Sequence, residues 1–394
     1  MSMEERLNPQ ITRIPPSGIR KFFDVVNEMP DAISLGVGEP DFVTPWNIRE
    51  AAMYSLEQGK TQYTSNSGMP QLREAICRYL KTRFQVEYDW ARETLITVGA
   101  SEGIDLAMRA VLQPGDEVLV PDPSYVSYDP CVRMAYGVTV PIKTRAREGF
   151  KLMPEDVLRA ITPRTKAIIV PYPNNPTGGV MERQYLQDLA AALEKTDLVV
   201  ISDEIYGELT YTEQGHVSIA SMPGMRERTV LLSGFSKCLA MTGWRVGYAC
   251  GPAPLIAAMT KIHQYTMLCA PIMGQNAALE GIESEMEHGY REMARMRRQY
   301  NRRRRIMLDG FARMGMDCFE PMGAFYAFPS IAATGMTSDE FCERLLYEQH
   351  VAVVPGTAFG ESGEGHVRCC YAVATDKIRE ALERMSAFMA RHRK

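Results

Sequence analysis

The stretch TVLLSGFSKCLAMTGWRVGYA, residues 229–249, places one lysine between two apolar runs. The runs at 229–232 and 245–249 are typical of strands that are buried on both faces of a sheet. Lys237 follows the first run and is itself followed by Cys, Leu, Ala and Met, so it does not belong to a solvated charged segment. Because burial disfavours the ammonium form, we expect a neutral, nucleophilic amine at Lys237.

Further apolar runs of the same kind precede this stretch, and amphipathic helix patterns separate several of them. The predicted strands lie at 95–98, 117–120, 166–170, 198–201, 229–232 and 245–249, and helix patterns lie at 103–112 and 183–194. Strands that alternate with helices indicate an α/β domain with a parallel sheet. The sequence therefore predicts a large domain with a doubly wound, mostly parallel sheet.

The two ends of the chain have a different pattern. Residues 1–45 are rich in proline and glycine, whereas residues 282–394 combine long helix patterns with short strand-like pieces at 324–328 and 351–354. We expect both ends to pack together as a smaller α+β domain, and residues 46–281 to form the large domain.

Composition limits the classes of function. The 394 residues carry a formal net charge of −4, which provides no electrostatic footprint for nucleic acid or for an anionic membrane. The nine cysteines form no Cys-x-x-Cys pair and no histidine completes a zinc site, so we predict no metal centre and a reducing, cytoplasmic location. No apolar run approaches the roughly 20 residues that span a bilayer. The expected partners are small molecules and a second copy of the chain.

Chemically distinctive residues follow five of the predicted strands, each just beyond the carboxyl end of its strand. In open α/β sheets this edge binds ligands, so we expect the five segments to line one pocket. They are Gly-Ala-Ser at 99–101, Pro-Asp-Pro-Ser-Tyr at 121–125, Pro-Tyr-Pro-Asn-Asn at 171–175, Asp-Glu-Ile-Tyr at 203–206 and the lysine segment at 233–237.

One end of this pocket suits a phosphate group. Ala100 and Ser101 start a predicted helix, where free backbone N–H groups and the helix dipole favour an anion. Arg245 can add a charge-assisted, bidentate hydrogen bond to the same group.

The other residues of the pocket suit an aromatic aldehyde. Asp203 can keep a pyridine nitrogen protonated, and Tyr125 can stack on the ring. Asn175 and Tyr206 can bind a phenolic oxygen, and Lys237 can form a Schiff base with the aldehyde. A small molecule that combines a phosphate, a pyridine, a phenol and an aldehyde is pyridoxal 5′-phosphate.

Each of these residues also has an ordinary structural interpretation. Asp203 with Glu204 is compatible with a helix N-cap, tyrosines are commonly packing residues, and Asn-Pro-Thr-Gly at 175–178 is a frequent turn sequence. The arginine-rich stretch 291–305 has acidic neighbours and is interpreted as a solvated helix face, not a nucleic-acid site. The convergence of five segments on one sheet edge favours the ligand pocket.

Seven motifs are distributed along the chain: LGVGEPDF (35–42), YTSNSG (63–68), PYPNNPTG (171–178), SDEIY (202–206), SK with MTGWRVGY (236–248), GAFYAFP (323–329) and HVRCCYA (366–372). Through these motifs the chain resembles the class I and II aminotransferases of fold type I, which use pyridoxal 5′-phosphate. The motifs cover essentially the whole chain. Within the family, the chain is similar to the branch of aromatic and N-acetyl-LL-diaminopimelate aminotransferases through SGIRKF (17–22), HQY (263–265) and GAFYAFPSI (323–331).

The resemblance implies a role for each cofactor-binding residue. Lys237 is the Schiff-base lysine, which also moves a proton between the substrate Cα and the cofactor. Asp203 pairs with the pyridinium nitrogen, Asn175 and Tyr206 bind the phenolate oxygen, and Tyr125 stacks on the ring. The implied phosphate ligands are Ala100, Ser101, Ser236 and Arg245, joined by Tyr63 from the second subunit of a homodimer.

The resemblance also implies where the substrate binds. Arg368 takes the substrate α-carboxylate as a bidentate pair, with help from the Gly38 backbone and the Asn175 side chain. The two-domain layout separately predicts that the small domain closes over the substrate, with residues 17–38 as the lid. Arg20 is a candidate partner for a distal carboxylate, although a solvated helix charge is the alternative interpretation. The wall around the substrate side chain is expected to include Ile19, Arg20, Tyr63, Tyr125 and Tyr265.

One position departs from the pattern of the family. Many relatives carry a serine three residues before the lysine, where this chain has Gly234. We expect Ser233 or Ser236 to replace that phosphate ligand. The glycine also argues against a Ser-x-x-Lys acyl hydrolase, whose nucleophilic serine would lie at position 234.

Three functions of different classes are compatible with these observations. The favoured one is an aminotransferase that moves the amino group of an aromatic, acidic or N-acetyl-diaminopimelate-like L-amino acid to a 2-oxo acid such as 2-oxoglutarate, by a ping-pong mechanism. A C–S β-lyase of the cystathionine type shares the fold and the first carbanion. A ligand sensor fused to a DNA-binding module is disfavoured, because no basic helix-turn-helix pattern accompanies the fold.

Overall fold

The computed structural model describes residues 3–16, 29 and 31–394, and its central element is a seven-stranded sheet. The strands lie across this sheet in the order β2-β8-β7-β6-β5-β3-β4. All neighbouring pairs are parallel except those of β8, which runs antiparallel to both β2 and β7. The predicted α/β class with a mostly parallel sheet is confirmed. The strands of the chain are β1 Ile33–Ser34, β2 Thr94–Thr97, β3 Glu117–Asp122, β4 Val138–Lys143, β5 Thr165–Val170, β6 Val199–Asp203, β7 Thr229–Gly234, β8 Gly247–Cys250, β9 Tyr326–Ala327, β10 Val351–Ala352, β11 Val354–Pro355 and β12 Val367–Cys370.

Several strands differ from the sequence prediction, including β1 and β12, which were not predicted, and two strands of the large sheet. The edge strand β4 was not predicted, because it is only partly buried and contains Pro141, which an edge strand tolerates. The last strand of the large sheet along the chain, β8, begins at Gly247 and not at Arg245. Arg245 has a φ of 54°, in the left-handed region, and this conformation ends the preceding turn before the strand starts.

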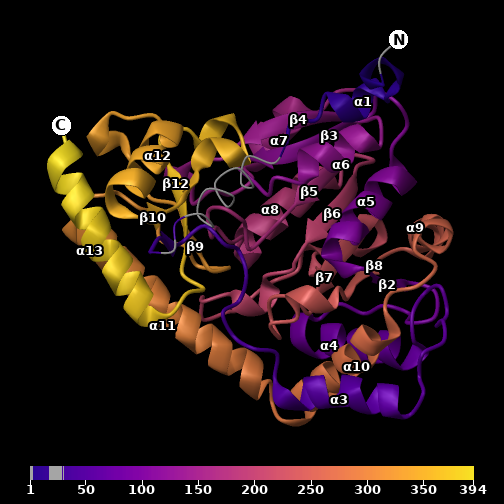
Figure 1. The fold of residues 1–394 in the computed structure, drawn as a ribbon. Coiled ribbons are helices and arrows are strands. Elements are labelled where there is room, and N and C mark those ends of the chain that lie inside the picture. Colours follow the sequence, from indigo (N-terminus) through magenta and orange to yellow (C-terminus); the bar gives the residue numbers. More distant parts are fainter. Residues whose placement is uncertain (1–2, 17–28, 30) are drawn as a thin grey trace.

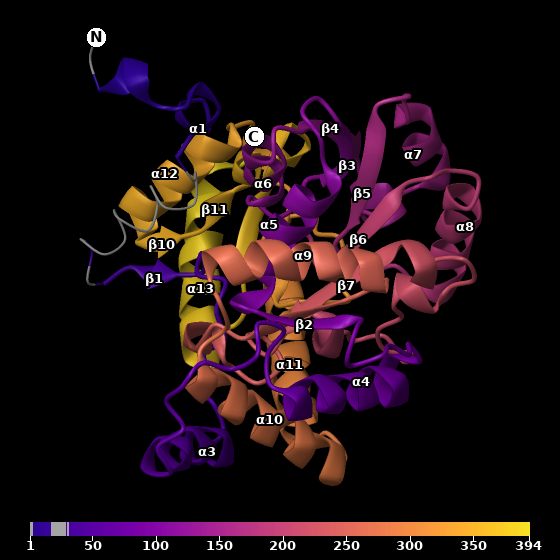
Figure 2. The ribbon, with the colours of Figure 1, turned by 90° about the vertical axis from the view of Figure 1, so that its right-hand side faces the viewer.

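Helices cover both faces of the large sheet, because successive strand residues point to opposite sides. On one face Val118 and Ile169 pack with α5, α6 and α9. On the other face Leu119 and Ile168 pack with α7 and α8. Figure 2 shows α9 across the front of the sheet, next to α5. The helices are α1 Pro9–Thr12, α3 Trp46–Glu57, α4 Pro70–Phe84, α5 Gly99–Val111, α6 Tyr128–Met134, α7 Pro154–Ala160, α8 Arg183–Leu193, α9 Ala253–Thr266, α10 Ile272–Glu287, α11 Arg291–Arg313, α12 Ser338–Gln349 and α13 Thr375–His392.

A second hydrophobic core joins the N-terminal strand to the C-terminal elements. β1 pairs in parallel with β10, and β12 lies between β11 and β9. This core includes apolar residues of α11, α12 and α13, and Figure 1 shows α13 (yellow) along α11 (orange) at one edge of the molecule. Directly after β1, the carbonyl oxygens of Leu35 and Gly36 accept hydrogen bonds from Cys370 and Arg368 of β12. The domain boundaries at 45 and 281 stay a prediction.

No helix among the described residues is both long enough and apolar enough to cross a lipid bilayer.

Candidate active site

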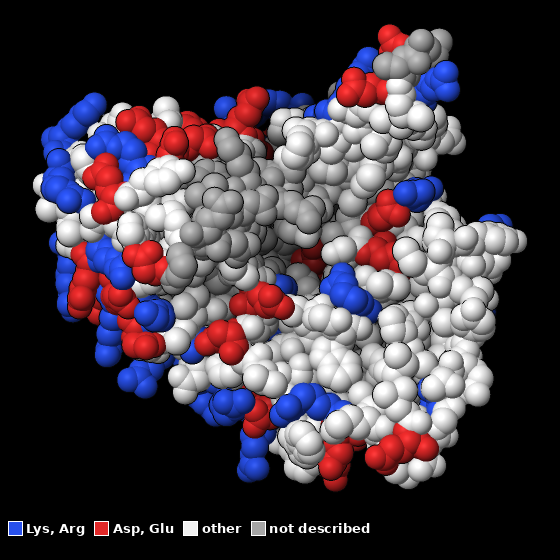
Figure 3. Space-filling view, in the orientation of Figure 1, with Lys and Arg blue, Asp and Glu red and all other residues white. Residues whose placement is uncertain are grey.

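A cavity of about 390 Å³ opens at the carboxyl edge of the large sheet. All five strand-following segments contribute to its wall, together with β9, β12 and the segment after β1. Figure 3 shows this face of the molecule hollowed near its centre, with acidic and basic side chains around the hollow. The predicted site residues that line the cavity are Gly38, Ala100, Ser101, Tyr125, Asn175, Asp203, Tyr206, Ser236, Lys237, Arg245 and Arg368.

Other predicted residues do not line the cavity. Tyr63 and Tyr265 are 81% and 82% exposed, and neither lines the cavity within one chain. Ile19 and Arg20 lie outside the described residues, as does most of the predicted lid at 17–38.

The start of α5 and the turn before β8 form an anion-binding corner of the cavity. Gly99 has a φ of 75°, and a Cβ atom at this position would lie 2.6 Å from Arg245 Nη2. Arg245 Nη1 donates a hydrogen bond of 2.9 Å to the Thr242 carbonyl oxygen, which holds the guanidinium beside the helix start. The first N–H groups of a helix have no intrahelical partner, so this corner combines free donors, a positive dipole end and a cation.

The backbone around position 234 explains the missing serine. A Cβ atom at Gly234 would lie 2.9 Å from both Gly247 Cα and the Val246 carbonyl oxygen, so the neighbouring strand leaves no room for a side chain. Ser233 Oγ donates to the Glu204 carbonyl oxygen at 3.3 Å and does not line the cavity. Of the two serines considered as replacements, Ser236 is the one in the cavity wall.

Asp203 ends β6 and presents its carboxylate to the cavity. Tyr128 donates a hydrogen bond of 2.8 Å to Oδ2, and the Ile205 backbone N–H donates one of 3.2 Å to Oδ1. Burial raises the pKa of Asp203 to about 6, against the opposing effect of the Tyr128 hydrogen bond. A cation placed beside this carboxylate would favour its ionised form.

Lys237 lies on the turn after β7, and its amine is in the cavity. Its Nζ donates a hydrogen bond of 2.8 Å to the Gly38 carbonyl oxygen. It lies 5.8 Å from the ring centroid of Tyr206 and 5.6 Å from that of Phe325. Burial lowers the pKa of Lys237 to about 8. A substantial fraction of the amine is therefore neutral just above neutral pH, which a nucleophile or base requires.

Arg368 brings a buried cation to the cavity wall. Its Nη1 donates to Asn175 Oδ1 at 2.9 Å and its Nη2 donates to the Gly36 carbonyl oxygen at 2.5 Å. The rings of Tyr326 and Phe359 lie 4.5 and 4.7 Å from the guanidinium carbon. The side chain is 2% exposed, its Nε has no hydrogen-bond partner, and no carboxylate among the described residues pairs with it. A buried guanidinium without an anion suits the carboxylate of a ligand.

Comparison with known proteins identifies the family. The model of "Aminotransferase class I and II" matches residues 30–385. The chain belongs to this family. The predicted resemblance and the predicted class of enzyme, an aminotransferase, are both confirmed.

Several relatives cover nearly the whole chain of this aminotransferase. It is 51% identical to "Putative aminotransferase YugH" of Bacillus subtilis (strain 168), over 98% of this chain and 99% of the relative. It is 43% identical to "Aspartate aminotransferase" of Pyrococcus abyssi, over 98% and 97% of the two chains. "Probable N-acetyl-LL-diaminopimelate aminotransferase" of B. subtilis is 41% identical over 99% and 98%. A solved aromatic aminotransferase from Pyrococcus horikoshii OT3 superposes with a TM-score of 0.89, at 41% identity over 94% and 99%.

Two tyrosines of the aminotransferase site were missed in the sequence. Tyr128 donates a hydrogen bond to Asp203. The hydroxyl groups of Tyr326 and Tyr206 lie 2.8 Å apart, and the Tyr326 ring packs against Arg368. The sequence contains a weak signal for each of these tyrosines. Tyr128 comes three residues after Tyr125, and Tyr326 lies within the motif GAFYAFP.

Replacing Asp203 with asparagine should stabilise the apoenzyme at neutral pH. The folded-state pKa of about 6 exceeds the ordinary value of 3.8, so between these values the unfolded chain loses its proton first and the folded state becomes relatively less stable as pH rises. Above pH 6 the full cost applies. We expect Asp203→Asn to raise the free energy of unfolding by about 2 kcal/mol at pH 8 and by little at pH 4.

Urea unfolding of the two apoproteins at pH 4 and pH 8 measures this difference. An equal stability difference at both pH values would contradict the pKa argument, because only ionisation of Asp203 makes the difference depend on pH.

Proposed function

We propose that this aminotransferase binds pyridoxal 5′-phosphate in the cavity and transfers the amino group of an L-amino acid to a 2-oxo acid in two half-reactions. The proposed donor is an aromatic, acidic or N-acetyl-diaminopimelate-like amino acid, and the proposed acceptor is 2-oxoglutarate. The names of the relatives supply these donor classes, and the shared feature of all of them is an α-carboxylate.

The single observation that carries the proposal is the pair of charged groups in one cavity. Lys237 presents an amine whose pKa is lowered to about 8 by burial, and Arg368 presents a buried guanidinium with an unpartnered Nε. An amino acid has the two groups that match them, a carboxylate for the arginine and an acidic Cα–H for the base. Binding to Arg368 would orient the Cα–H toward Lys237.

The remaining residues fit the proposed cofactor. The corner formed by α5 and Arg245 suits its phosphate, and Asp203 suits its ring nitrogen. Asn175 uses Oδ1 to accept from Arg368, so its amide N–H groups remain free to donate to the phenolic oxygen of the cofactor, and Tyr206 also lines the cavity.

We assign the following roles to the protein groups. When bound, the cofactor supplies an electron sink for the charge that develops at the substrate Cα. Lys237 Nζ removes the Cα proton as a general base. Asp203 holds a proton on the ring nitrogen, and Arg368 fixes the α-carboxylate.

A donor panel tests the proposed function. The holoenzyme is mixed with glutamate, aspartate, phenylalanine, tyrosine and N-acetyl-LL-diaminopimelate in turn, and the near-visible absorption band of the cofactor is followed. A true donor bleaches the band, and 2-oxoglutarate restores it. The proposal fails if no band appears after reconstitution, or if cystathionine releases ammonia and pyruvate without an oxo acid while no donor gives amino transfer.

We also propose that the enzyme is a cytoplasmic homodimer. All nine cysteines are free, which supports a reducing compartment. Large apolar side chains on α3 and on segments near Tyr63 and Tyr265 are exposed in the single chain, and these support a subunit interface. They include Trp46, Met53, Tyr54, Leu56, Met267, Leu268 and Met273.

A mixture of two impaired variants, Lys237→Ala and Tyr63→Ala, tests the shared site. Lys237→Ala should be inactive, and Tyr63→Ala should lose about tenfold in kcat/KM through one lost phosphate hydrogen bond. In a heterodimer, the site with an intact Lys237 receives an intact Tyr63 from the other subunit. After subunit exchange, an equal mixture should regain about a quarter of wild-type activity, because half of the dimers carry one complete site.

Steady-state rates before and after exchange, with each variant alone as control, measure this recovery. If the mixture stays at the average of the two separate variants, Tyr63 does not act in the partner's site.

A further inference from the structure

Glu204 is a buried acidic residue that the proposed function does not use. It follows Asp203 directly and is 4% exposed. Consecutive residues at a strand end point to opposite sides, so Asp203 lines the cavity and Glu204 does not. Its carboxylate therefore needs a separate explanation, because an unpaired buried carboxylate is costly.

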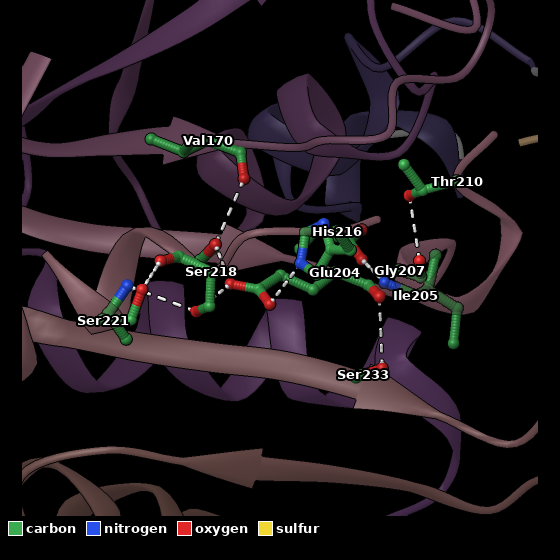
Figure 4. Close-up of polar contacts among 12 residues, drawn as sticks. Val170, Glu204, Ile205, Gly207, Thr210, His216, Ser218, Ser221 and Ser233 are labelled. Carbon is green, nitrogen blue, oxygen red and sulfur yellow. Dashed lines mark hydrogen bonds and ion pairs between the residues drawn. The ribbon is translucent and has the colours of Figure 1, made fainter. Parts of the chain in front are cut away.

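Both oxygens of the Glu204 carboxylate have hydrogen-bond partners, three in total. Oε1 accepts from Ser202 Oγ at 2.8 Å and from Ser218 Oγ at 2.7 Å, and Oε2 lies 2.7 Å from His216 Nε2. Figure 4 shows the Glu204 side chain between His216 and Ser218. The donors come from β6 and from the segment that precedes β7, so this one side chain links two separate parts of the chain.

The backbone of Glu204 is held as firmly as its side chain. Its N–H donates to the Leu232 carbonyl oxygen at 2.8 Å. Its carbonyl oxygen accepts from the Gly207 N–H at 2.9 Å and from Ser233 Oγ at 3.3 Å. Residue 204 is therefore a fixed point in the tight turn that separates Asp203 from Tyr206.

His216 completes this arrangement. Its side chain is 7% exposed, and its ring packs edge-on against Phe84 with centroids 5.2 Å apart. A Cβ atom at Gly207 would lie 3.0 Å from His216 Cδ2, so the imidazole also rests against the backbone that follows Tyr206. The imidazole thus contacts the turn at two points, Glu204 and Gly207.

We propose that Glu204 and His216 are positioning residues, which fix the turn at 203–206 so that Asp203 and Tyr206 meet the cofactor in the correct geometry. This inference rests on the proposed function, since it assumes that the cavity binds pyridoxal 5′-phosphate. Glu204 touches neither cofactor nor substrate. Glu204 acts indirectly, because it fixes the positions of the Asp203 carboxylate and the Tyr206 phenol.

The main test compares the cofactor affinity of two glutamate variants. Glu204→Ala removes the acceptor of Ser218 and the partner of His216, and it leaves Ser202 only the Val170 carbonyl oxygen at 3.5 Å. We therefore expect the dissociation constant of pyridoxal 5′-phosphate for the apoenzyme to rise at least about tenfold. Glu204→Gln keeps an oxygen that accepts from both serines and an amide that can donate to the imidazole, so its dissociation constant should stay within about threefold of wild type. The pH midpoint of the bound cofactor's absorption band should shift in the alanine variant only.

Glu117→Ala is the matched control. Glu117 is also buried, at 3% exposure, and accepts hydrogen bonds from Thr162 and Arg164 at the amino end of β3, away from the cavity. Glu117→Ala removes the same side-chain atoms as Glu204→Ala, and Thr162 and Arg164 lose their acceptor. We expect a loss of thermal stability similar to that of Glu204→Ala, with cofactor affinity within about twofold of wild type.

The affinities of these variants separate the positioning role of Glu204 from the proposed binding of the cofactor. Wild-type affinity and an unshifted midpoint in Glu204→Ala would overturn the positioning role, as would an equal loss of affinity in Glu117→Ala. If Glu204→Ala does not fold, His216→Ala and Ser218→Ala each remove one partner of the carboxylate and should weaken cofactor binding about threefold. Failure of the wild-type apoenzyme to bind pyridoxal 5′-phosphate would instead overturn the proposed function.

Discussion

Replacing Lys237 with alanine is expected to lower the kcat of amino transfer by about 10⁴-fold or more. The amine is the one basic group in the described part of the cavity whose lowered pKa, about 8, suits proton transfer at the substrate Cα near neutral pH. Stopped-flow bleaching of the cofactor band in a single half-reaction measures the loss directly. Lys261→Ala, on the exposed side of α9, is the control and should behave as wild type.

A small amine added to the solution should restore part of the Lys237→Ala rate. The truncated side chain leaves space beside the Gly38 carbonyl oxygen, which accepts a hydrogen bond from Lys237 Nζ in the intact protein. Methylamine or ethylamine can occupy that space and act as the base, and rescue should follow the concentration of the unprotonated amine. A variant that keeps more than about a tenth of the wild-type rate without added amine would contradict the role of Lys237 as the base.

The sequence predicted the cavity because of where its chemical groups lie along the chain. Asp203, Asn175 and Lys237 each follow an apolar run, and strands of a parallel sheet bring their carboxyl ends to one edge. The convergence of these ends depends on neither the exact bounds of the strands nor their order. The predicted cavity is therefore found despite the antiparallel orientation of β8 and the start of that strand at Gly247.

The residues that were missed depend on contacts between distant parts of the chain. Tyr326 meets Tyr206 across 120 positions, and no local pattern in either segment indicates which of the many tyrosines makes that contact. In the sequence, Glu204 together with Asp203 is compatible with a helix N-cap. Its partners in the structure, His216 and Ser218, lie in an irregular segment that no local pattern connects to residue 204. Gly234 looked like a lost phosphate ligand until the approach of Gly247 showed that a side chain does not fit there.

Replacing Arg368 with glutamine is expected to lower kcat/KM for every amino-acid donor by about 10³-fold, because the substrate carboxylate loses a buried, charge-assisted partner. Arg368→Lys keeps the charge but cannot reproduce the planar pair of hydrogen bonds, and it should still lose about 10²-fold. Steady-state kinetics with two donors of different side chains measure both losses. The loss should be equal for the two donors, since Arg368 contacts the group that they share.

The amide of the preferred donor separates a binding role from a structural one. An amino-acid amide has no carboxylate, so wild type should strongly prefer the acid whereas Arg368→Gln should hardly distinguish the two.

The stability of the apoenzyme provides a second test of the same role. Because Arg368 is a buried cation whose Nε has no partner, its removal should leave the free energy of unfolding unchanged or higher. Equal losses for acid and amide, together with a destabilised apoenzyme, would show that Arg368 supports the fold and does not bind the carboxylate.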